Sequence, residues 1–343
     1  MKKILVVGGA GYIGSHCVRE LQRLGYPTVV LDSLITGHRQ AIHEVPLLPI
    51  DLQNTGEVKR ALELHGPFAG VFHFASFIEV GKSVQDPLSF YRNNVSNTMS
   101  LLEAMVATRV PYLIWSSSAA VYGEPRYTPL DEQHPAGPIN PYGQTKWMVE
   151  NILGDCDKAY GIRSCSLRYF NAAGAHPTGD IGEDHHPESH LIPKILQVAL
   201  AVKRGEKPAP VQIFGNDYAT PDGTGVRDYI HVCDLALAHI LALKYLEQGG
   251  SSDVFNLGNG QGYTVKQVLE TCRQVSGVDI PSVTVARRSG DCAVLVASAA
   301  KITKVLGWQP QYPSLQDIVK HAWNWHLHHP QGFEITVKPE RSV

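Results

Sequence analysis

The residues with the clearest chemical potential are Ser118, Tyr142 and Lys146. Tyr142 and Lys146 are four positions apart near the start of a predicted helix over residues 142–160, and this spacing places both side chains on one helical face. A phenol has an ordinary pKa of about 10, but a neighbouring ammonium group favours the phenolate. Tyr142 is therefore a candidate base that takes a proton from a hydroxyl group while hydride leaves the same carbon.

Ser118 follows a predicted buried strand over residues 112–115. This places it at the carboxyl end of the expected sheet, where open α/β sheets bind their ligands. Its hydroxyl is suited to bridge a substrate oxygen and Tyr142. Taken singly, each feature has a simpler explanation, because a Tyr/Lys pair is common on helix surfaces and serines are common after strands. The functional interpretation depends on finding all three behind a dinucleotide-type turn.

Such a turn is present at the amino-terminal end. Gly8, Gly11 and Gly14 have the spacing GxxGxxG between the first expected strand and the first expected helix. Glycines allow a tight turn whose backbone N–H groups and helix N-terminus hold a pyrophosphate. Asp32 follows 18 residues after Gly14 at the end of the second expected strand, where an acid accepts the ribose hydroxyls of adenosine. An acid repels a 2′-phosphate, so NAD is favoured over NADP. Asp51 is a weaker candidate near the adenine.

Short apolar runs alternate with helical patterns through the first half of the chain. This alternation predicts an α/β protein, a Rossmann-type doubly wound parallel sheet with a smaller α/β domain. We place the dinucleotide-binding domain with the catalytic residues at 1–171 and the second domain at 172–343, and we leave open that some segments of the second domain return to the first. The expected strands cover residues 4–7, 28–31, 71–74, 112–115 and 163–170, and the expected helices cover 12–24, 57–65, 87–108, 142–160, 195–203, 234–247, 265–276 and 315–328. Residues 171–193 are expected to form a loop.

Composition excludes several classes of function. The 343 residues carry a net charge of −2 without a basic run, which argues against a nucleic-acid or membrane surface. The six cysteines lack CxxC spacing, so we expect reduced thiols in a cytoplasmic protein and no metal site. Residues 1–9 begin with lysines and a short apolar run, but the run ends at glycines, which predicts a strand rather than a secretory leader. No apolar stretch is long enough for a membrane span.

With these residues identified, the chain resembles the extended short-chain dehydrogenase/reductase family and, within it, the UDP-glucose 4-epimerases. The resemblance runs through nearly the whole chain. It is marked by the glycine turn, the Tyr/Lys pair and three longer motifs: SSSAAVYG at 116–123, LRYFNAAGA at 167–175 and VQIFGNDYATPDGTGVRDYIHV at 211–232. It implies an isomerase of galactose metabolism that interconverts UDP-galactose and UDP-glucose through a 4-keto sugar on tightly held NAD. It also implies a homodimer built from helices of the first domain, to which Phe90, Tyr91, Leu101, Leu102 and Met105 contribute unless they form core.

The resemblance also implies a set of binding residues in both domains. Asn171 and Arg227 are expected at the substrate diphosphate, Leu191 near the uridine diphosphate and Phe214 beside the uracil. Arg288 is expected at phosphate and Asp291 at the uridine ribose. The family's NAD contacts match Tyr12, Ile13, Asp32, Asp51, Leu52, Phe74, Ala75, Asn93 and Phe170, in addition to Tyr142 and Lys146.

Several positions depart from the pattern of the relatives. Val7 stands where many of them carry Thr before the glycines. Ile78 stands where the best-matched relatives carry a lysine that reaches the cofactor, and His190 stands where they carry an amide near the substrate. Leu295 falls where a Tyr restricts the pocket to plain hexoses and a small residue admits N-acetylated sugars. Its intermediate size leaves open a different or broader specificity, with UDP-N-acetylglucosamine or UDP-xylose as the alternative substrates.

Rival functions differ in the residues that they need. Nucleotide-sugar 4,6-dehydratases carry an Asp-Glu pair directly after the position of Ser118, and related decarboxylases carry a glutamate in this stretch. Ala119 and Ala120 stand here, and alanine cannot transfer protons, so both rivals are disfavoured. A NAD-sensing binding protein without catalysis is the remote alternative, disfavoured because Ser118, Tyr142 and Lys146 are all present.

Overall fold

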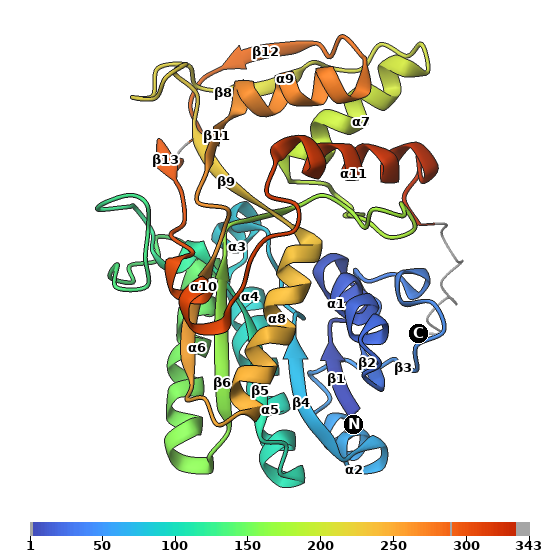
Figure 1. The fold of residues 1–343 in the computed structure, drawn as a ribbon, viewed down its shortest axis with the longest axis vertical. Coiled ribbons are helices and arrows are strands. Elements are labelled where there is room, and N and C mark those ends of the chain that lie inside the picture. Colours follow the sequence, from blue (N-terminus) through green and yellow to red (C-terminus); the bar gives the residue numbers. More distant parts are fainter. Residues whose placement is uncertain (1–2, 289, 334–343) are drawn as a thin grey trace.

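Figure 1 shows the computed structural model, which describes residues 3–288 and 290–333. The ends of the two predicted domains, residues 1–2 and 334–343, lie outside the described residues. The protein has two bodies, a large sheet flanked by helices and a smaller body at the carboxyl edge of that sheet. The expected α/β fold with a Rossmann-type doubly wound sheet is confirmed.

The large body is built on a seven-stranded sheet in which every pair is parallel. Its inner strands are apolar runs buried on both faces, as expected where helices cover both sides of a parallel sheet. In spatial order the strands are β10 (Asp253–Leu257), β6 (Arg163–Tyr169), β5 (Tyr112–Ser118), β4 (Phe68–His73), β1 (Lys3–Val7), β2 (Thr28–Leu31) and β3 (Leu47–Leu48).

Helices on the two faces of this sheet form two separate cores (Figure 1). On one face α1 (Tyr12–Arg23) packs against α8 (Val232–Glu247). On the other face lie α2 (Thr55–His65), α5 (Asn97–Thr108) and α6 (Pro141–Tyr160). Shorter elements connect these parts: η1 (Arg39–Ile42), α3 (Val80–Gln85), α4 (Pro87–Tyr91), η2 (Arg92–Ser96), η3 (Ala119–Val121) and α10 (Ala300–Leu306).

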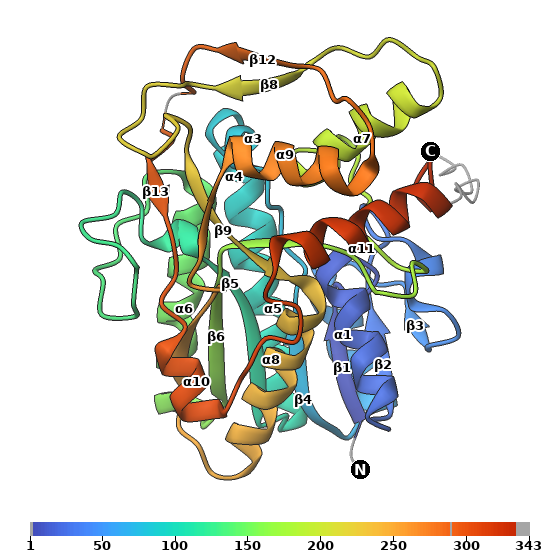
Figure 2. The ribbon, with the colours of Figure 1, turned by 45° about the horizontal axis from the view of Figure 1, so that its top comes forward.

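The smaller body groups three helices with short strands around a core of its own (Figure 2). Its helices are α7 (Leu191–Lys203), α9 (Val265–Ser276) and α11 (Leu315–His328). One small sheet contains β11 (Gly262–Thr264), β9 (Val226–His231), β13 (Val294–Leu295) and β7 (Asn171–Ala173), and a second pairs β8 (Val211–Phe214) with β12 (Ser282–Val285).

The chain beyond residue 171 contributes to both bodies. Strand β10 pairs in parallel with β6 and completes one edge of the large sheet, although it follows β7, β8 and β9 in sequence. Helix α8, which precedes it, covers the face on which α1 lies. The second half of the chain therefore supplies part of the first sheet and its core as well as the smaller body.

The expected helices and strands of the first half are present, with one irregularity. The helix expected over residues 87–108 is divided into α4, the π-helical turn η2 and α5. The loop expected over 171–193 was wrong at both ends, because β7 begins at Asn171 and α7 begins at Leu191.

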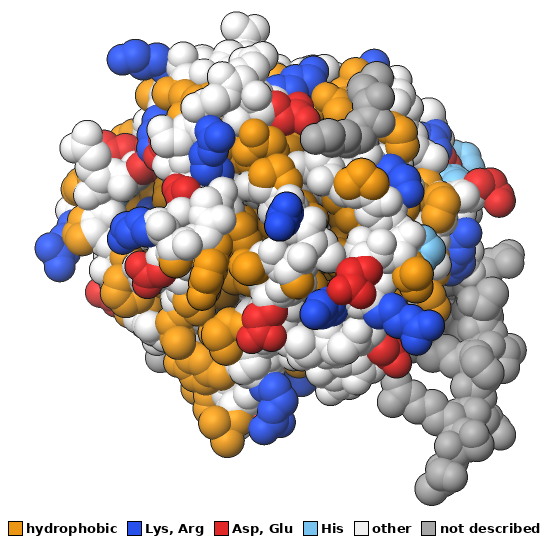
Figure 3. All heavy atoms as spheres, turned by 90° about the horizontal axis from the view of Figure 1, so that it is seen from below, with side chains coloured by type: hydrophobic (Ala, Val, Ile, Leu, Met, Phe, Trp, Pro, Cys, Tyr) orange, Lys and Arg blue, Asp and Glu red, His pale blue; other side chains and the backbone are white. Residues whose placement is uncertain are grey.

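Charged side chains of both signs lie on one face of the protein (Figure 3), and its described helices are not of the membrane-spanning kind. On the face in Figure 3, basic and acidic side chains are interspersed, and hydrophobic side chains gather along part of the same face. Among the helices of residues 3–288 and 290–333, none combines the length and the apolar character that crossing a bilayer requires.

Candidate active site

A cleft of about 2460 Å³ lies between the carboxyl edge of the large sheet and the smaller body. Typical small-molecule pockets measure roughly 300–1,000 Å³, so this cleft has room for two ligands side by side. Both bodies line it. Every residue that the sequence analysis selected for binding or catalysis lines this cleft, except Lys146.

The glycine turn between β1 and α1 forms one wall. Gly8 has φ +76°, and a Cβ there would lie 2.5 Å from the Ala75 backbone nitrogen. A Cβ on Gly14 would lie 2.2 Å from the Gly8 carbonyl oxygen. These close approaches require glycine, and they bring the N-terminus of α1 to the cleft with Gly11 on its surface. The turn fits a pyrophosphate, which binds to backbone N–H groups at a helix N-terminus.

Asp32 directly follows β2 and is fixed beside this turn. Its carboxylate accepts hydrogen bonds from the backbone N–H groups of Ala10 and Leu34, both at 2.9 Å. Burial raises the pKa of Asp32 above its ordinary value, and these two hydrogen bonds oppose the shift. The carboxylate therefore has a fixed orientation at the cleft wall, as an acceptor for ribose hydroxyls requires.

The other expected cofactor residues come from the first turn of α1 and from the segments that follow neighbouring strands. They lie at the carboxyl end of the sheet along one side of the cleft: Tyr12, Ile13, Asp51, Leu52, Phe74, Ala75 and Phe170. Asn93 reaches the cleft from η2, and π-helical turns are frequent at functional sites. The neighbouring Asn94 holds this turn, because its side chain bonds to both backbone groups of Phe77 and to the Thr145 hydroxyl.

The N-terminus of α6 positions Tyr142. Asn140 caps this helix by accepting a hydrogen bond from the Gly143 N–H at 2.9 Å, and Pro141 occupies the first turn, where the missing N–H of proline costs no hydrogen bond. Ser118 ends β5, and its hydroxyl accepts a hydrogen bond from the Ala120 N–H. Tyr142 and Ser118 both line the cleft.

Lys146 lies one turn further along α6 and beneath the cleft surface. It is 1% exposed. Its ammonium donates to the Ser76 hydroxyl at 2.9 Å and to the Ser116 carbonyl at 2.7 Å. It also lies 5.8 Å from the centre of the Tyr142 ring. Because Ser76 lines the cleft, Lys146 is connected to the cleft from below through its hydrogen bond to Ser76.

Burial shifts the pKa of both members of this pair. Burial lowers the pKa of Lys146 to about 7, against the opposing attraction of Glu150. Burial also raises the pKa of Tyr142, and a side-chain hydrogen bond with Ser118 opposes that shift. In the protein alone the neutral phenol is therefore favoured, so positive charge beside Tyr142 is needed before it acts as a base.

Charged side chains gather at the opposite end of the cleft. Arg227 lies with its guanidinium 3.6 Å from the Asp291 carboxylate, and Arg288 pairs with the same carboxylate at 3.0 Å. The Arg288 guanidinium lies 5.2 Å from the centre of the Phe214 ring. Two arginines, a carboxylate and a half-exposed aromatic ring together offer groups for a phosphate, a ribose and a base.

Three expected substrate residues lie between the two ends. Asn171 begins β7, and its amide donates to the Asp228 carbonyl at 2.7 Å. Leu191 is the first residue of α7. Leu295 lies in β13 beside Arg227 and packs in a small apolar group that includes Phe170. All three line the cleft.

The sequence analysis missed several residues of the cleft wall. Ser76 receives the Lys146 hydrogen bond, and its position in the stretch after β4 was the signal that could have indicated it. The segment 33–39 follows Asp32 along the wall, and Tyr218 lines the opposite end. Ile78 and His190, which depart from the pattern of relatives, also line the cleft.

A Rossmann-type sheet with this glycine turn, an acid after β2 and a Ser/Tyr/Lys set defines a class of enzymes that oxidise and reduce hydroxyl carbons with a dinucleotide. Residues 4–258 match the model of the NAD dependent epimerase/dehydratase family. The chain belongs to this family.

Individual proteins support the same assignment. The UDP-glucose 4-epimerase of Halalkalibacterium halodurans is 49% identical over 338 residues, which is 98% of this chain and 99% of that protein. The Brucella ovis UDP-glucose 4-epimerase, solved in complex with NAD, is 42% identical with a TM-score of 0.90, over 94% of this chain and 98% of that one. The Bifidobacterium longum UDP-glucose 4-epimerase, solved with NAD+ and UDP, is 36% identical with a TM-score of 0.90, over 96% and 100% of the two chains.

Proposed function

We propose that this protein is an isomerase that interconverts UDP-galactose and UDP-glucose by inverting the hydroxyl group at C4, with NAD as its retained cofactor. The observation that carries this proposal is the position of Ser118 and Tyr142 on the wall of one cleft between the glycine turn and the two arginines. A reacting hydroxyl placed there is next to a dinucleotide on one side and attached to a diphosphate on the other. The match to UDP-glucose 4-epimerases over nearly the full chain supports it.

The residues of the first wall fit NAD. Gly8, Gly11 and Gly14 would hold the pyrophosphate, and Asp32 would accept the hydroxyls of the adenosine ribose. The remaining contacts would come from Tyr12, Ile13, Asp51, Leu52, Phe74, Ala75, Asn93, Tyr142, Lys146 and Phe170. When bound, NAD supplies the redox chemistry of the reaction, since its nicotinamide accepts a hydride from C4 and later returns it.

The residues of the opposite end fit a uridine diphosphate. Arg227 and Arg288 would bind phosphate oxygens, for which the planar guanidinium is well suited. Asp291 would accept ribose hydroxyls, and Phe214 would lie beside the uracil. Asn171 and Leu191 would contact the diphosphate portion. Since Arg227 and Arg288 share the Asp291 carboxylate in the protein alone, a bound diphosphate would replace part of that pairing.

Side chains of the protein transfer the proton of the C4 hydroxyl group. Tyr142 accepts the proton of the C4 hydroxyl and later returns it to the same oxygen, once hydride has been restored to C4 from the opposite face of the sugar. Ser118 bridges the substrate oxygen and Tyr142. Lys146, held by Ser76 and the Ser116 carbonyl, supplies the positive charge that favours the Tyr142 phenolate. Inversion requires that the sugar turn over while the uridine diphosphate stays bound.

Ala119 and Ala120 favour epimerisation over dehydration. Both follow Ser118 directly and line the cleft. Elimination of water from C5 and C6 needs an acid and a base at this point, and a methyl group provides neither. Without these groups the keto sugar does not lose water, and its remaining reaction is reduction back to an alcohol.

We also propose that two copies of the chain associate through the helices α3, α4 and α5. Of the residues expected from sequence, Phe90, Leu101, Leu102 and Met105 are buried core and Tyr91 is partly buried, so they are not the contact surface. Exposed apolar side chains on the same helices offer the alternative: Val84, Leu88, Met99 and Val106.

Leu88→Glu is expected to shift the sedimentation coefficient to that of a monomer. Leu64→Glu on α2 is the control and should leave the sedimentation coefficient unchanged. A monomeric wild-type chain would refute the dimer.

For the two domains, we propose that the boundary at residue 171 separates the chain by function. Residues 1–171 carry the NAD-binding and catalytic groups. Apart from Asn171, Ser118 and Tyr142, the nucleotide-sugar contacts lie in residues 172–343, which also return α8 and β10 to the first sheet.

The deciding experiment is an NMR assay of the purified protein with UDP-galactose and without added NAD. Formation of UDP-glucose is expected, because the cofactor is regenerated in each cycle and stays bound. Absence of product with NAD added would refute the proposal and favour a different nucleotide sugar. UDP-N-acetylgalactosamine and UDP-xylose in the same assay measure the breadth of specificity that Leu295 permits.

A further inference from the structure

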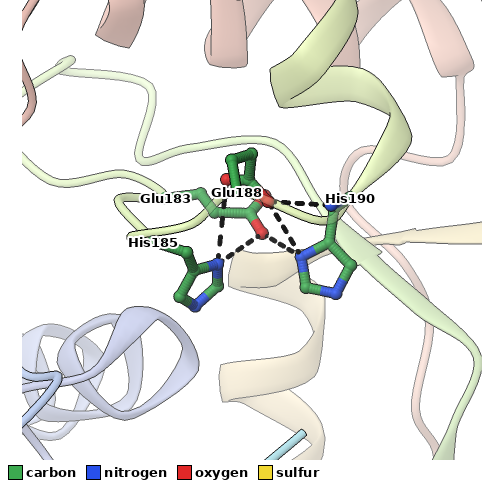
Figure 4. A group of neighbouring side chains, drawn as sticks. All are labelled: Glu183, His185, Glu188 and His190. Atoms are coloured by element: carbon green, nitrogen blue, oxygen red, sulfur yellow. Dashed lines mark hydrogen bonds and ion pairs between the residues drawn. The ribbon is translucent and has the colours of Figure 1, made fainter. Parts of the chain in front are cut away.

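The segment that joins β7 to α7 contains a cluster of four side chains that the proposed reaction does not use. These are Glu183, His185, Glu188 and His190, here called the His–Glu cluster (Figure 4). One ligand-type atom from each of the four lies within 4.8 Å of the other three. In Figure 4 the Glu183 carboxylate lies between the two imidazole rings, and the Nδ1 atom of each ring faces it.

The distances within the His–Glu cluster resemble those between the ligands of one small cation. Nδ1 of His185 lies 3.1 Å from Glu183 and 3.8 Å from Glu188. Nδ1 of His190 lies 2.5 Å from Glu183 and 3.6 Å from Glu188. Nitrogen and oxygen ligands at about 2.0–2.1 Å from a tetrahedral zinc ion are about 3.4 Å apart. Three of the four separations therefore lie within about 0.4 Å of that spacing. The fourth, between His190 and Glu183, is a direct hydrogen bond that must open for both groups to bind one ion.

Burial and charge make the His–Glu cluster costly unless positive charge is present. The side chains of Glu183 and Glu188 are only 4% and 6% exposed, so two carboxylates are largely removed from water. A buried carboxylate needs a partner of opposite charge. In the protein alone the two imidazoles supply this charge, because burial is outweighed by the carboxylates, which raise the pKa of both His185 and His190. A divalent cation would take the place of the two imidazole protons and leave both rings neutral, which is the form that binds metals.

A further observation is that Nδ1 of His185 does not point at a hydrogen-bond partner. Nδ1 of His185 is shielded from solvent and makes no hydrogen bond within the described part of the chain, although it lies 3.1 Å from a Glu183 oxygen. A separation of 3.1 Å is short enough for a hydrogen bond, so the bond is missing because Nδ1 does not point at the Glu183 oxygen. A cation between the four groups would use the same nitrogen as a ligand without requiring it to point at an oxygen.

The surroundings of the His–Glu cluster hold its members in place. The Glu188 carboxylate accepts hydrogen bonds from the N–H groups of Ser189 and His190. The Trp325 indole of α11 donates to the Glu183 carbonyl at 3.1 Å. The His185 ring makes an edge contact with Tyr12, with ring centres 6.2 Å apart. Contacts of this kind orient metal ligands and raise their affinity.

We propose that the His–Glu cluster binds one zinc ion through Glu183, His185, Glu188 and His190. Two imidazoles and two carboxylates form a ligand set that suits zinc and related divalent transition metals rather than Mg²⁺ or Ca²⁺, which prefer oxygen ligands alone. The role is structural, because the ion fastens the segment between Tyr12 on the first body and Leu191 at the start of α7. The proposal goes beyond the epimerase activity and does not depend on it.

The test is a titration of the chelator-treated, full-length protein with Co²⁺ and then Zn²⁺. One Co²⁺ per chain should produce the visible absorption of a tetrahedral site, Zn²⁺ should displace it, and Zn²⁺ should raise the melting temperature. Glu183→Gln and His190→Asn should each weaken binding by about a hundredfold or more. If the buried Glu183 variant fails to fold, His190→Asn decides, since the His190 side chain is 43% exposed.

His186→Ala is the matched control, because His186 belongs to the same segment but pairs with Asp184 outside the His–Glu cluster. This variant should bind Co²⁺ as the wild type does. The proposal is overturned if the wild type binds neither metal, if His190→Asn binds with unchanged affinity, or if His186→Ala loses binding equally. Retained binding in His190→Asn would place the metal at another group of histidines.

Discussion

At the residue scale, burial controls the ionisation of Tyr142 and Lys146, the proposed catalytic pair. The pKa of Lys146 is lowered to about 7 by burial, which places it close to neutral pH, whereas burial raises the pKa of Tyr142. Near pH 7 a small change in local charge therefore changes the protonation of Lys146 more than that of an ordinary surface lysine. The pair is suited to respond to a charged ligand in the cleft.

Removal of the Tyr142 hydroxyl tests the assignment of the base. Tyr142→Phe is expected to lower turnover of UDP-galactose by about a thousandfold, because general base catalysis contributes roughly 10²–10⁴-fold. NAD released by denaturation should remain at the wild-type amount. Tyr160→Phe, at the exposed end of the same helix, is the control with unchanged turnover. Native turnover in Tyr142→Phe would show that another group is the base.

The size of the side chain at position 295 tests the specificity. Leu295→Tyr is expected to raise the preference for UDP-galactose over UDP-N-acetylgalactosamine by about tenfold or more, because a larger ring fills space that an acetyl group needs. The ratio of kcat/KM for the two substrates measures this. Leu295→Met keeps the volume and should keep the ratio; an unchanged ratio in Leu295→Tyr would place the selectivity elsewhere.

At the element scale, the site depends on where strands end and helices begin. The glycine turn and Asp32 each follow a strand of the same parallel sheet, Ser118 ends another of its strands, and Tyr142 lies in the first turn of α6. Because parallel strands place their carboxyl ends on one edge, residues more than a hundred positions apart meet there. The topology of the sheet therefore brings these residues together, and the local turns set only their orientation.

Gly14→Ala tests how strictly the turn is required. The added methyl group would lie 2.2 Å from the Gly8 carbonyl oxygen and 2.8 Å from the Gly9 Cα, so the turn must shift. We expect the purified variant to contain little NAD and to melt at a lower temperature. Gly154→Ala in α6 meets nothing within 4 Å, and it should keep NAD and gain about 1 kcal/mol of stability. Full NAD content in Gly14→Ala would contradict the role of this turn.

The sequence predicted elements best where periodicity was long. Helices such as α6 and α8 extend over many turns, so their apolar spacing is clear before any contact is known. Strands β7, β11 and β13 contain two or three residues each, and they exist because they pair with β9 from a distant part of the chain. The His–Glu cluster was missed for a similar reason, since its residues lie in a stretch without period.

For the site, the sequence could place a residue at the cleft where the residue type is tied to its position in an element. Gly14 and Tyr142 could be selected because each stands at a fixed place relative to a strand or a helix. Arg227 and Asp291 were selected through the resemblance, because nothing in their local spacing brings them together. Ser76 was missed, since a lone serine after a strand becomes informative only when the Lys146 ammonium is found beside it.

At the scale of the whole molecule, buried neutral histidines couple stability to pH. Burial lowers the pKa of His73 to about 3 and that of His239 to about 4. His239 lies in the core between α8 and the sheet, 4.7 Å from the Phe74 ring centre, and its Nε2 has no partner among the described residues. These imidazoles stay neutral in the folded protein at a pH where the unfolded chain is protonated.

The sign of the effect follows from proton binding. Between pH 6.5 and about 4 the unfolded chain binds a proton at His239 that the folded protein excludes, so the free energy of unfolding falls as the pH falls. From pH 7 to pH 5 this loss is about 2 kcal/mol for one such histidine. In His239→Phe the decrease measured by urea unfolding should be smaller by about that amount. An equal decrease in both proteins would show that His239 is protonated in the fold.

The return of β10 to the large sheet has a consequence for synthesis on the ribosome. Until residue 257 has emerged, β6 is an open edge with unpaired backbone groups, and Phe255 and Leu257 are missing from the core. Open edges of this kind pair readily with other chains. The large sheet therefore stays incomplete at β6 until the part of the chain that forms much of the smaller body has been synthesised. A chain cut at residue 171 is expected to aggregate rather than fold as an independent unit.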